Sequence, residues 1–194
     1  MPEEIDPCAV AHTPVPAASS STASSSTASS TTVSGGFLAP DRTLIAVFAS
    51  PVAAFLLRYA SDAGFRGLLV EPDPDRAAGA AMSGFGVLPA MPDEIEGADV
   101  VVTDHHRDEL GVVLRDALAI KARWIGVMGN PKHPAPHIPA LEALGVPPGD
   151  ISRVHRPIGL NIGSRTPPEI AIATLAGLLA DRNARPGGFD FPAA

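Results

Sequence analysis

The stretch PIGLNIGSRTPPEIA, residues 157–171, joins a glycine-containing loop to a well-marked helix start. Gly159 and Gly163 leave the backbone free to adopt positive φ or to approach another group closely. Neither glycine carries a side chain that would cover its own amide. We therefore expect this loop to offer backbone N–H groups to a ligand.

Three residues mark where the following helix begins. Thr166 is the expected N-cap, Pro167 suits the first helical position, and Glu169 completes a capping box by reaching back to the N-cap amide. Apolar residues then recur at helical spacing through about Asp181. Because a helix N-terminus is electropositive, we expect an anion to bind where the loop meets this helix.

Composition limits the classes of protein to which the chain can belong. The 194 residues fit one ordinary domain, and the net charge of −7 gives little electrostatic support for nucleic-acid binding. The single cysteine, Cys8, excludes an intramolecular disulfide and a cysteine-built zinc site. No secretory signal or membrane-spanning run is evident, so we expect a cytoplasmic protein that does not bind membranes.

The chain divides into three predicted parts. Residues 1–40 form a predicted disordered tail, because 13 of the 16 residues from Ser19 to Ser34 are serine or threonine. Residues 41–184 form the predicted folded domain. Residues 185–194 are predicted to form a flexible C-terminal tail.

Short apolar runs alternate with helical patterns from residue 43 onward. The predicted strands cover Thr43–Ala49, Arg66–Val70, Gly86–Leu88, Ala98–Thr103 and Arg123–Met128. The predicted helices cover Pro51–Ala63, Asp75–Ser83, Asp108–Ile120, a segment around Ile138–Leu144 and the helix after Thr166, with a turn at Val146–Asp150. This alternation predicts an α/β fold: a Rossmann-type doubly wound, mostly parallel sheet with helices on both faces.

The turn after the first strand departs from the usual dinucleotide fingerprint. In the segment Phe48–Ala53, only Ala53 matches the G-x-G-x-x-G/A pattern, while Ser50 stands where close approach to a pyrophosphate requires glycine. Glu71 ends the second strand, at the place of a ribose-binding acid. An NAD(P)-dependent oxidoreductase therefore remains an alternative function.

A polar segment, TDHHRDEL, follows the fourth strand. The fourth strand of this fold lies beside the first, so Asp104, His105 and His106 are predicted to face the same crevice as the first turn. Residues of these types can form hydrogen bonds to a ligand, transfer protons or bind a metal ion. No third metal ligand has a recognisable spacing, so we expect ligand contact, or loop and cap roles, rather than a metal site.

The loop GVMGNPKH follows the fifth strand, again at a carboxyl end. Gly129 permits a sharp turn, and Lys132 is a candidate phosphate partner or else an ordinary solvated lysine. Arg156, just ahead of the glycine-containing loop, is suited to bidentate phosphate contacts. The sequence supplies no nucleophile and base pair, so no catalytic residue is predicted.

Three segments together resemble the C-terminal Rossmann domain of the XdhC/CoxI family. They are TDHHRDEL, WIGVMGN and HRPIGLNIGSRTPPEIAIATLAGLLADR. Members of this family are accessory proteins of xanthine dehydrogenase and carbon monoxide dehydrogenase. The resemblance covers roughly Thr43 to Arg182.

The resemblance implies a chaperone that is not itself an enzyme, that binds molybdenum cofactor, as molybdopterin or its dinucleotide form, and that helps to insert it into a molybdoenzyme. The implied partners are the apo molybdoenzyme and a separate XdhC-type N-terminal domain protein, and a homodimer is left open. A Rossmann interaction module that has lost its ligand is a further alternative. The candidate cofactor-binding residues are Ser50, Asp104, His105, His106, Gly129, Lys132, Pro157, Gly159, Gly163, Arg165 and Thr166.

Overall fold

The structure is a computed structural model that describes residues 42–81, 84–130 and 132–185. The predicted N-terminal tail, residues 1–40, lies outside the described residues, and so does the predicted C-terminal tail, residues 185–194, except for its first residue. Six strands are present: β1 (Arg42–Val47), β2 (Phe65–Val70), β3 (Gly86–Leu88), β4 (Asp99–Val102), β5 (Trp124–Val127) and β6 (Val154–His155). The helices are α1 (Pro51–Asp62), α2 (Pro74–Ala81), α3 (Leu110–Ala119), α4 (His137–Glu142), α5 (Pro148–Ile151) and α6 (Pro167–Arg182).

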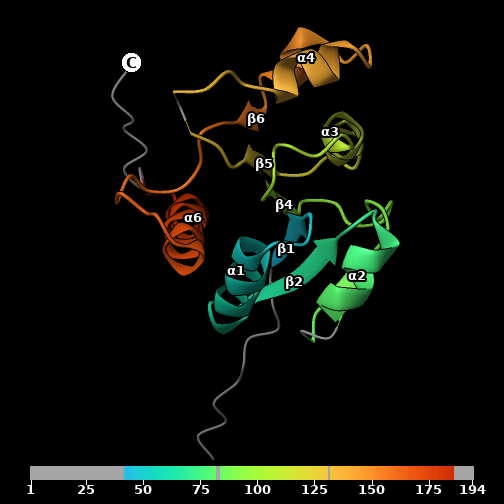
Figure 1. The fold of residues 1–194 in the computed structure, drawn as a ribbon. Helices are drawn as coiled ribbons and strands as arrows, with labels where there is room; N and C mark the ends of the chain where they lie inside the picture. The colour runs from blue at the N-terminus through green and yellow to red at the C-terminus, as the bar shows by residue number, and fades with distance from the viewer. Residues whose placement is uncertain (1–41, 82–83, 131, 186–194) are drawn as a thin grey trace, which may run out of the picture. The chain divides into compact units, whose positions relative to one another are not determined.

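All strands run parallel in a single sheet with the order β3-β2-β1-β4-β5-β6 (Figure 1). The order reverses between β1 and β4, as in a doubly wound Rossmann sheet. Val47 at the end of β1 lies opposite Val70 and Val102, and Val102 lies opposite Val127. The carboxyl ends of β1, β2, β4 and β5 are therefore level, and the loops that follow them meet at one edge. The predicted fold class is confirmed.

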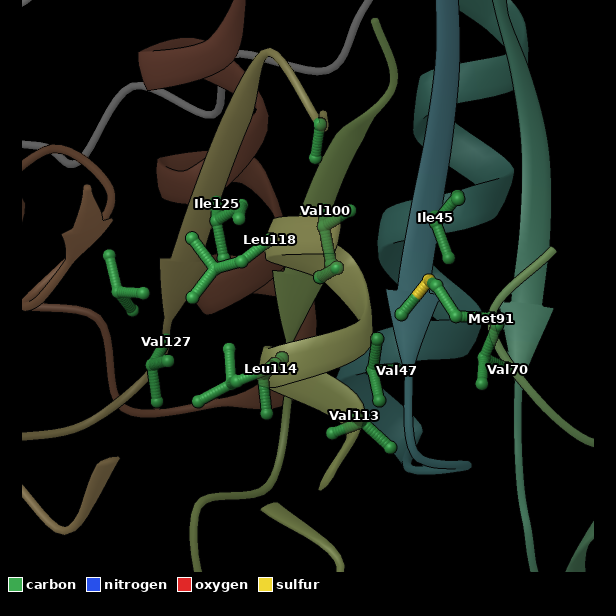
Figure 2. Packing of buried hydrophobic residues seen from close by; sticks show 14 of the residues in the cluster. Ile45, Val47, Val70, Met91, Val100, Val113, Leu114, Leu118, Ile125 and Val127 are labelled. Atoms are coloured by element: carbon green, nitrogen blue, oxygen red, sulfur yellow. The ribbon is translucent and has the colours of Figure 1, made fainter. Parts of the chain in front are cut away.

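Helices cover both faces because alternate strand residues point to opposite sides. Ile45 and Val47 belong to the cluster that includes Leu114 and Leu118 of α3 (Figure 2). Leu44, which precedes Ile45 and points to the opposite face of the sheet, packs instead with residues of α1 and α6. Burial on both faces explains why these strands read as unbroken apolar runs.

The predicted turn at Val146–Asp150 contains the single-turn helix α5, which begins at Pro148. Proline has its φ preset for the first helical position, so the same residues suit a turn and a short helix. The two-residue strand β6 was not predicted, because two residues are too few to show a periodic pattern.

A buried ion-pair cluster lies at the opposite end of the sheet, where the strands begin. Asp99 is fully buried and pairs with Arg42 at 2.8 Å and with Arg123. Arg123 also pairs with Asp181 near the end of α6. These charges join the start of β1, the start of β4 and the last turn of α6.

Helix α6 is the longest described helix, with 16 residues, and it contacts α1 on one face of the sheet (Figure 1). Among the helices that the structure describes, none combines the length and the apolar character that crossing a membrane requires.

Candidate functional site

A cavity of about 450 Å³ opens at the carboxyl ends of β4 and β5, beside the point where the strand order reverses. Its walls come from the first turn of α1 at Val52, the segments after β4 and β5, the glycine-containing loop and the first turns of α6. We call it the switch-point cavity. Ligands of doubly wound sheets bind at this position.

The walls of the switch-point cavity combine neutral polar groups with apolar ones. The polar lining residues are Thr103, His105, Asn130, Asn161, Ser164 and Thr174. The apolar lining residues include Met128, Ile158, Leu160 and Ile170. Within the described part of the chain, no lysine or arginine lines this cavity. Apolar walls with a few hydrogen-bonding groups suit a flat heterocycle that carries amide and amine edges.

Ser50 and Thr103 link the segments that follow β1 and β4. The two hydroxyl oxygens lie 2.9 Å apart, and the Thr103 hydroxyl also lies within hydrogen-bond distance of the Val47 and Phe48 carbonyls. The Ser50 hydroxyl accepts the Ala53 N–H at 3.0 Å and so caps α1. Ser50 thus has a structural role in α1, and it lines a smaller neighbouring cavity rather than the switch-point cavity.

His105 lines the switch-point cavity and lies against His106, with ring centroids 4.0 Å apart and the ring planes tilted by 38°. Burial lowers the pKa of His105, and the neighbouring His106 and Arg156 lower that pKa further. The neutral imidazole offers one donor and one acceptor to a ligand. Asp104 is occupied locally, because its carboxylate accepts the His106 N–H at 3.0 Å. In the described residues, no cluster of three or more His, Cys, Asp or Glu side chains is arranged to hold a metal ion.

Arg156 holds the loop that follows β5. Its guanidinium donates to the carbonyls of Asn130 and His133, each at 3.1 Å. Gly129 makes room for this contact, since a Cβ there would lie 2.6 Å from the Arg156 Nε. Lys132 is exposed and is not among the residues that line the switch-point cavity. Arg156 therefore acts as a loop anchor.

The two glycines of the loop have different roles. Gly159 has φ +88°, and a Cβ there would lie 3.1 Å from the backbone nitrogen of Thr174 in α6. The next residue, Leu160, donates its N–H to the Ala173 carbonyl at 3.0 Å. Gly163 has φ +69°, lines the switch-point cavity with Pro157, and has no atom within 4 Å of its Cβ position. Gly159 thus allows the loop to pack on α6, and Gly163 faces open space.

The helix start was predicted correctly, but its amides are already used. The Glu169 carboxylate accepts the N–H groups of Arg165 and Thr166 at 2.8 and 3.1 Å, and these bonds lower the pKa of Glu169. Pro167 and Pro168 have no N–H to offer. The expected anion at this junction would have to displace Glu169. Arg165 and Thr166 are exposed and are not among the cavity-lining residues.

Glu71, expected at the place of a ribose-binding acid, is fully buried and bonded within the protein. Its carboxylate accepts the Ala49 and Asp73 N–H groups at 2.7 and 3.0 Å. It also pairs with Arg107, whose guanidinium lies 3.1 and 3.3 Å from the two carboxylate oxygens. The Arg107 guanidinium lies 4.7 Å from the ring centroid of Phe48, which is buried. The Glu71 and Arg107 side chains thus fill the end of β2 beside Phe48, next to the cavity of about 250 Å³ that Ser50 lines.

Of the predicted site residues, the structure brings His105, Gly129, Pro157 and Gly163 together around the switch-point cavity. Sequence reasoning did not select Asn161, Ser164 or Thr174, although the first two lie within the glycine-containing stretch of residues 157–171. Their polar side chains next to Gly163 were the available signal. Thr174 is buried on α6, where the helical spacing of its apolar neighbours gives no sign of a cavity.

Comparison with known proteins identifies the family. The family model described as the XdhC Rossmann domain matches residues 44–178. The chain belongs to the XdhC Rossmann-domain family. This finding confirms the family resemblance that the sequence motifs indicated.

Two relatives of this XdhC domain are informative. The uncharacterised protein YqeB of Escherichia coli is 33% identical over 89 residues, a match that covers 46% of this chain and 16% of YqeB. A solved structure from Bacillus halodurans, described as a xanthine dehydrogenase, superposes with a TM-score of 0.58 at 23% identity and covers 74% of this chain and 43% of that one. The XdhC domain therefore spans less than half the length of either relative.

Proposed function

We propose that this XdhC domain carries molybdenum cofactor as cargo in the switch-point cavity and assists its insertion into a molybdoenzyme of the xanthine dehydrogenase or carbon monoxide dehydrogenase type. The observation that carries the proposal is the mixed lining of that cavity. The pterin of the cofactor is a flat heterocycle with amide and amine edges. Asn161, Ser164 and the neutral His105 are hydrogen-bonding partners of matching chemistry.

The cavity fits the pterin better than it fits a strongly bound phosphate. The described lining residues include no cationic side chain, and Arg156 is committed to two backbone carbonyls. The amides of Arg165 and Thr166 are held by Glu169. A carrier must also release its cargo, and modest phosphate affinity favours release.

The proposed partners are the apo molybdoenzyme and a separately encoded XdhC-type N-terminal domain protein. The proposed role of this chain is therefore cofactor maturation in the cytoplasm rather than catalysis.

Co-purification tests the proposal. The full chain is isolated from molybdate-fed cells, the bound material is oxidised, and the fluorescent pterin is quantified per mole of protein. We expect pterin with the wild type and a large loss with Asn161→Trp, which places a ring at an exposed position of the cavity wall. The matched control is Arg165→Trp, also exposed but not among the cavity-lining residues, which should retain the wild-type amount. Equal pterin in both variants, or none in the wild type, would contradict the proposal.

An NAD(P)-dependent oxidoreductase is the less favoured function. Dinucleotide binding in this fold uses the first turn and an acid at the end of β2. Here that acid, Glu71, is buried and paired with Arg107.

A further inference from the structure

A second cavity, of about 400 Å³, lies at the edge of the sheet and is lined by residues of α4, α5 and β6. Strand β6 is the last in the sheet order, and α4 lies close to it (Figure 1). We call it the edge cavity. Its volume is typical of small-molecule sites. It shares no lining residue with the switch-point cavity, so its chemistry is separate from that of the proposed function.

Most of the edge-cavity wall is apolar. The apolar lining residues are Ala135, Ile138, Pro148, Ile151 and Val154. Ile151 and Val154 are buried and belong to the main apolar cluster of the domain, so the core holds this part of the wall in place. The wall therefore suits a ligand that has an apolar body.

His137 contributes a polar group to this apolar wall. The residue is 4% exposed, and within the described part of the chain its Nδ1 is buried without a hydrogen-bond partner. Buried polar atoms of native proteins are nearly always hydrogen-bonded, either to the protein or to another bound group. The unpartnered nitrogen therefore points to a ligand that forms a hydrogen bond with it.

Arg156 lines the same cavity and brings a positive charge. Its Nη1 and Nη2 each donate one hydrogen bond to a backbone carbonyl, at 3.1 Å, which leaves a second N–H on each nitrogen. None of the ion pairs in the described segments involves Arg156. Burial lowers the pKa of Arg156, and burial together with the charge of Arg156 lowers the pKa of His137. The half-buried guanidinium thus has no counter-charge from the described residues.

The other two polar residues of the wall do not supply that counter-charge. Glu142 is exposed and forms no ion pair with either His137 or Arg156. The Ser152 hydroxyl is exposed and donates to the Gly149 carbonyl at 2.7 Å. An anion is therefore the group that complements this end of the cavity.

We propose that the edge cavity binds a small monocarboxylate, with its carboxylate at His137 and Arg156 and its apolar body against Ile151 and Val154. Hydrogen bonds between a guanidinium and a carboxylate are among the stronger ones in proteins. Inorganic phosphate would make no use of the apolar wall, and a neutral apolar molecule would leave the Arg156 charge without a partner. This site goes beyond the proposed function and does not depend on it.

Nuclear magnetic resonance titration of the full chain tests the proposal. The probes are benzoate and isovalerate, added at constant ionic strength to about 20 mM, well above an expected Kd of about 1 mM for ligands of this size. We expect saturable shifts of the His137 imidazole signal and of the Ile151 and Val154 amide signals. Benzamide, which has the same ring but no charge, should bind at least about tenfold more weakly than benzoate.

Three variants locate the site. Ile138→Trp adds a ring to the cavity wall at a position that is 41% exposed, and it should abolish carboxylate binding. Val112→Trp is the matched control, since Val112 is 43% exposed and does not line the edge cavity, and it should bind like the wild type. Arg156→Gln should weaken binding at least about tenfold. Far-UV circular dichroism checks its fold, and Ile138→Trp carries the test if Arg156→Gln is unfolded.

Three results would each overturn the proposal. They are the absence of a saturable shift with both carboxylates, benzamide binding as tight as benzoate binding, and wild-type binding by Ile138→Trp. Because the two cavities share no lining residue, none of these results bears on pterin binding, and a chain that binds no pterin could still bind the carboxylate.

Discussion

Replacing each of the two loop glycines by alanine distinguishes a glycine that packs on α6 from one that only lines the cavity. Gly159 and Gly163 both have positive φ, a conformation that costs a residue with a Cβ about 1–2 kcal/mol. At Gly159 the added Cβ would also lie 3.1 Å from the Thr174 nitrogen and 3.2 Å from the Ala173 carbonyl carbon. Backbone atoms of a buried helix cannot move aside as the end of a side chain can, so about 1–3 kcal/mol of overpacking is added.

Gly159→Ala should therefore lower the free energy of unfolding by about 2–5 kcal/mol, and Gly163→Ala by about 1–2 kcal/mol. Both changes restrict the unfolded chain equally, a term of about 0.4–1 kcal/mol that cancels from the comparison. The expected difference is about 1–3 kcal/mol, with Gly159→Ala the less stable variant.

Urea unfolding followed by Trp124 fluorescence and far-UV circular dichroism measures both variants. Trp124 is half-buried and stacks on His155, with ring centroids 5.4 Å apart, so its emission reports the folded sheet edge. Equal destabilisation of the two variants would refute the distinct roles that we assign to the glycines. A neutral Gly159→Ala would refute the close packing of the loop on α6.

Three further predictions concern charge. Asp99→Ala should cost about 1–3 kcal/mol in urea unfolding, because it removes the buried carboxylate between Arg42 and Arg123 and leaves them only the half-exposed Asp181 as a partner. The half-exposed Asp116→Ala should cost about 0.5 kcal/mol or less, and equal losses would contradict this. Burial lowers the pKa of His137 below its ordinary 6.5. As the pH falls, the imidazole is therefore protonated in the unfolded chain before it is protonated in the folded one, and the stability of the fold decreases below about pH 6.5. His137→Leu should reduce that slope relative to the wild type, as thermal unfolding across the pH range can measure, and an unchanged slope would contradict the assignment to His137. Hydrogen bonds from two backbone N–H groups lower the pKa of Glu169, so the stability that its carboxylate contributes is present above the ordinary carboxyl pKa and is lost as the pH falls through the lowered pKa. Glu169→Gln should therefore reduce the loss of stability on acidification. An unfolding profile that this substitution leaves unchanged would argue against the cap.

The sequence predicted the layers well because the central strands β1 and β4 are buried on both faces. Runs such as Leu44–Val47 and Val100–Val102 have no polar position, and this composition is typical of a parallel sheet. The order of the strands followed from the fold class, and it placed the segments after β4 and β5 at one edge. The structure accordingly places His105 and Gly129, which follow these two strands, in the lining of one cavity.

The sequence did not show which polar groups the protein itself would use. The capping box at Glu169 was recognised, but it also withdraws the Arg165 and Thr166 amides from any ligand. Glu71 was expected at the ribose position, and its partner Arg107 lies 36 residues away in the chain. Such pairings depend on side-chain directions in the folded sheet, which periodicity does not reveal.

The ion-pair cluster where the strands begin has a practical consequence for shortening the chain. Arg42 is the first residue of β1, and its guanidinium is one of the two that neutralise Asp99. A truncation that starts at Thr43 would remove from the β1–β2 register only the pairing of Arg42 with Phe65, and yet leave that carboxylate with half of its counter-charge. The amino-terminal boundary of any minimal domain therefore belongs before Arg42, and a deletion series stepping across this residue should show its largest drop in melting temperature at that single step.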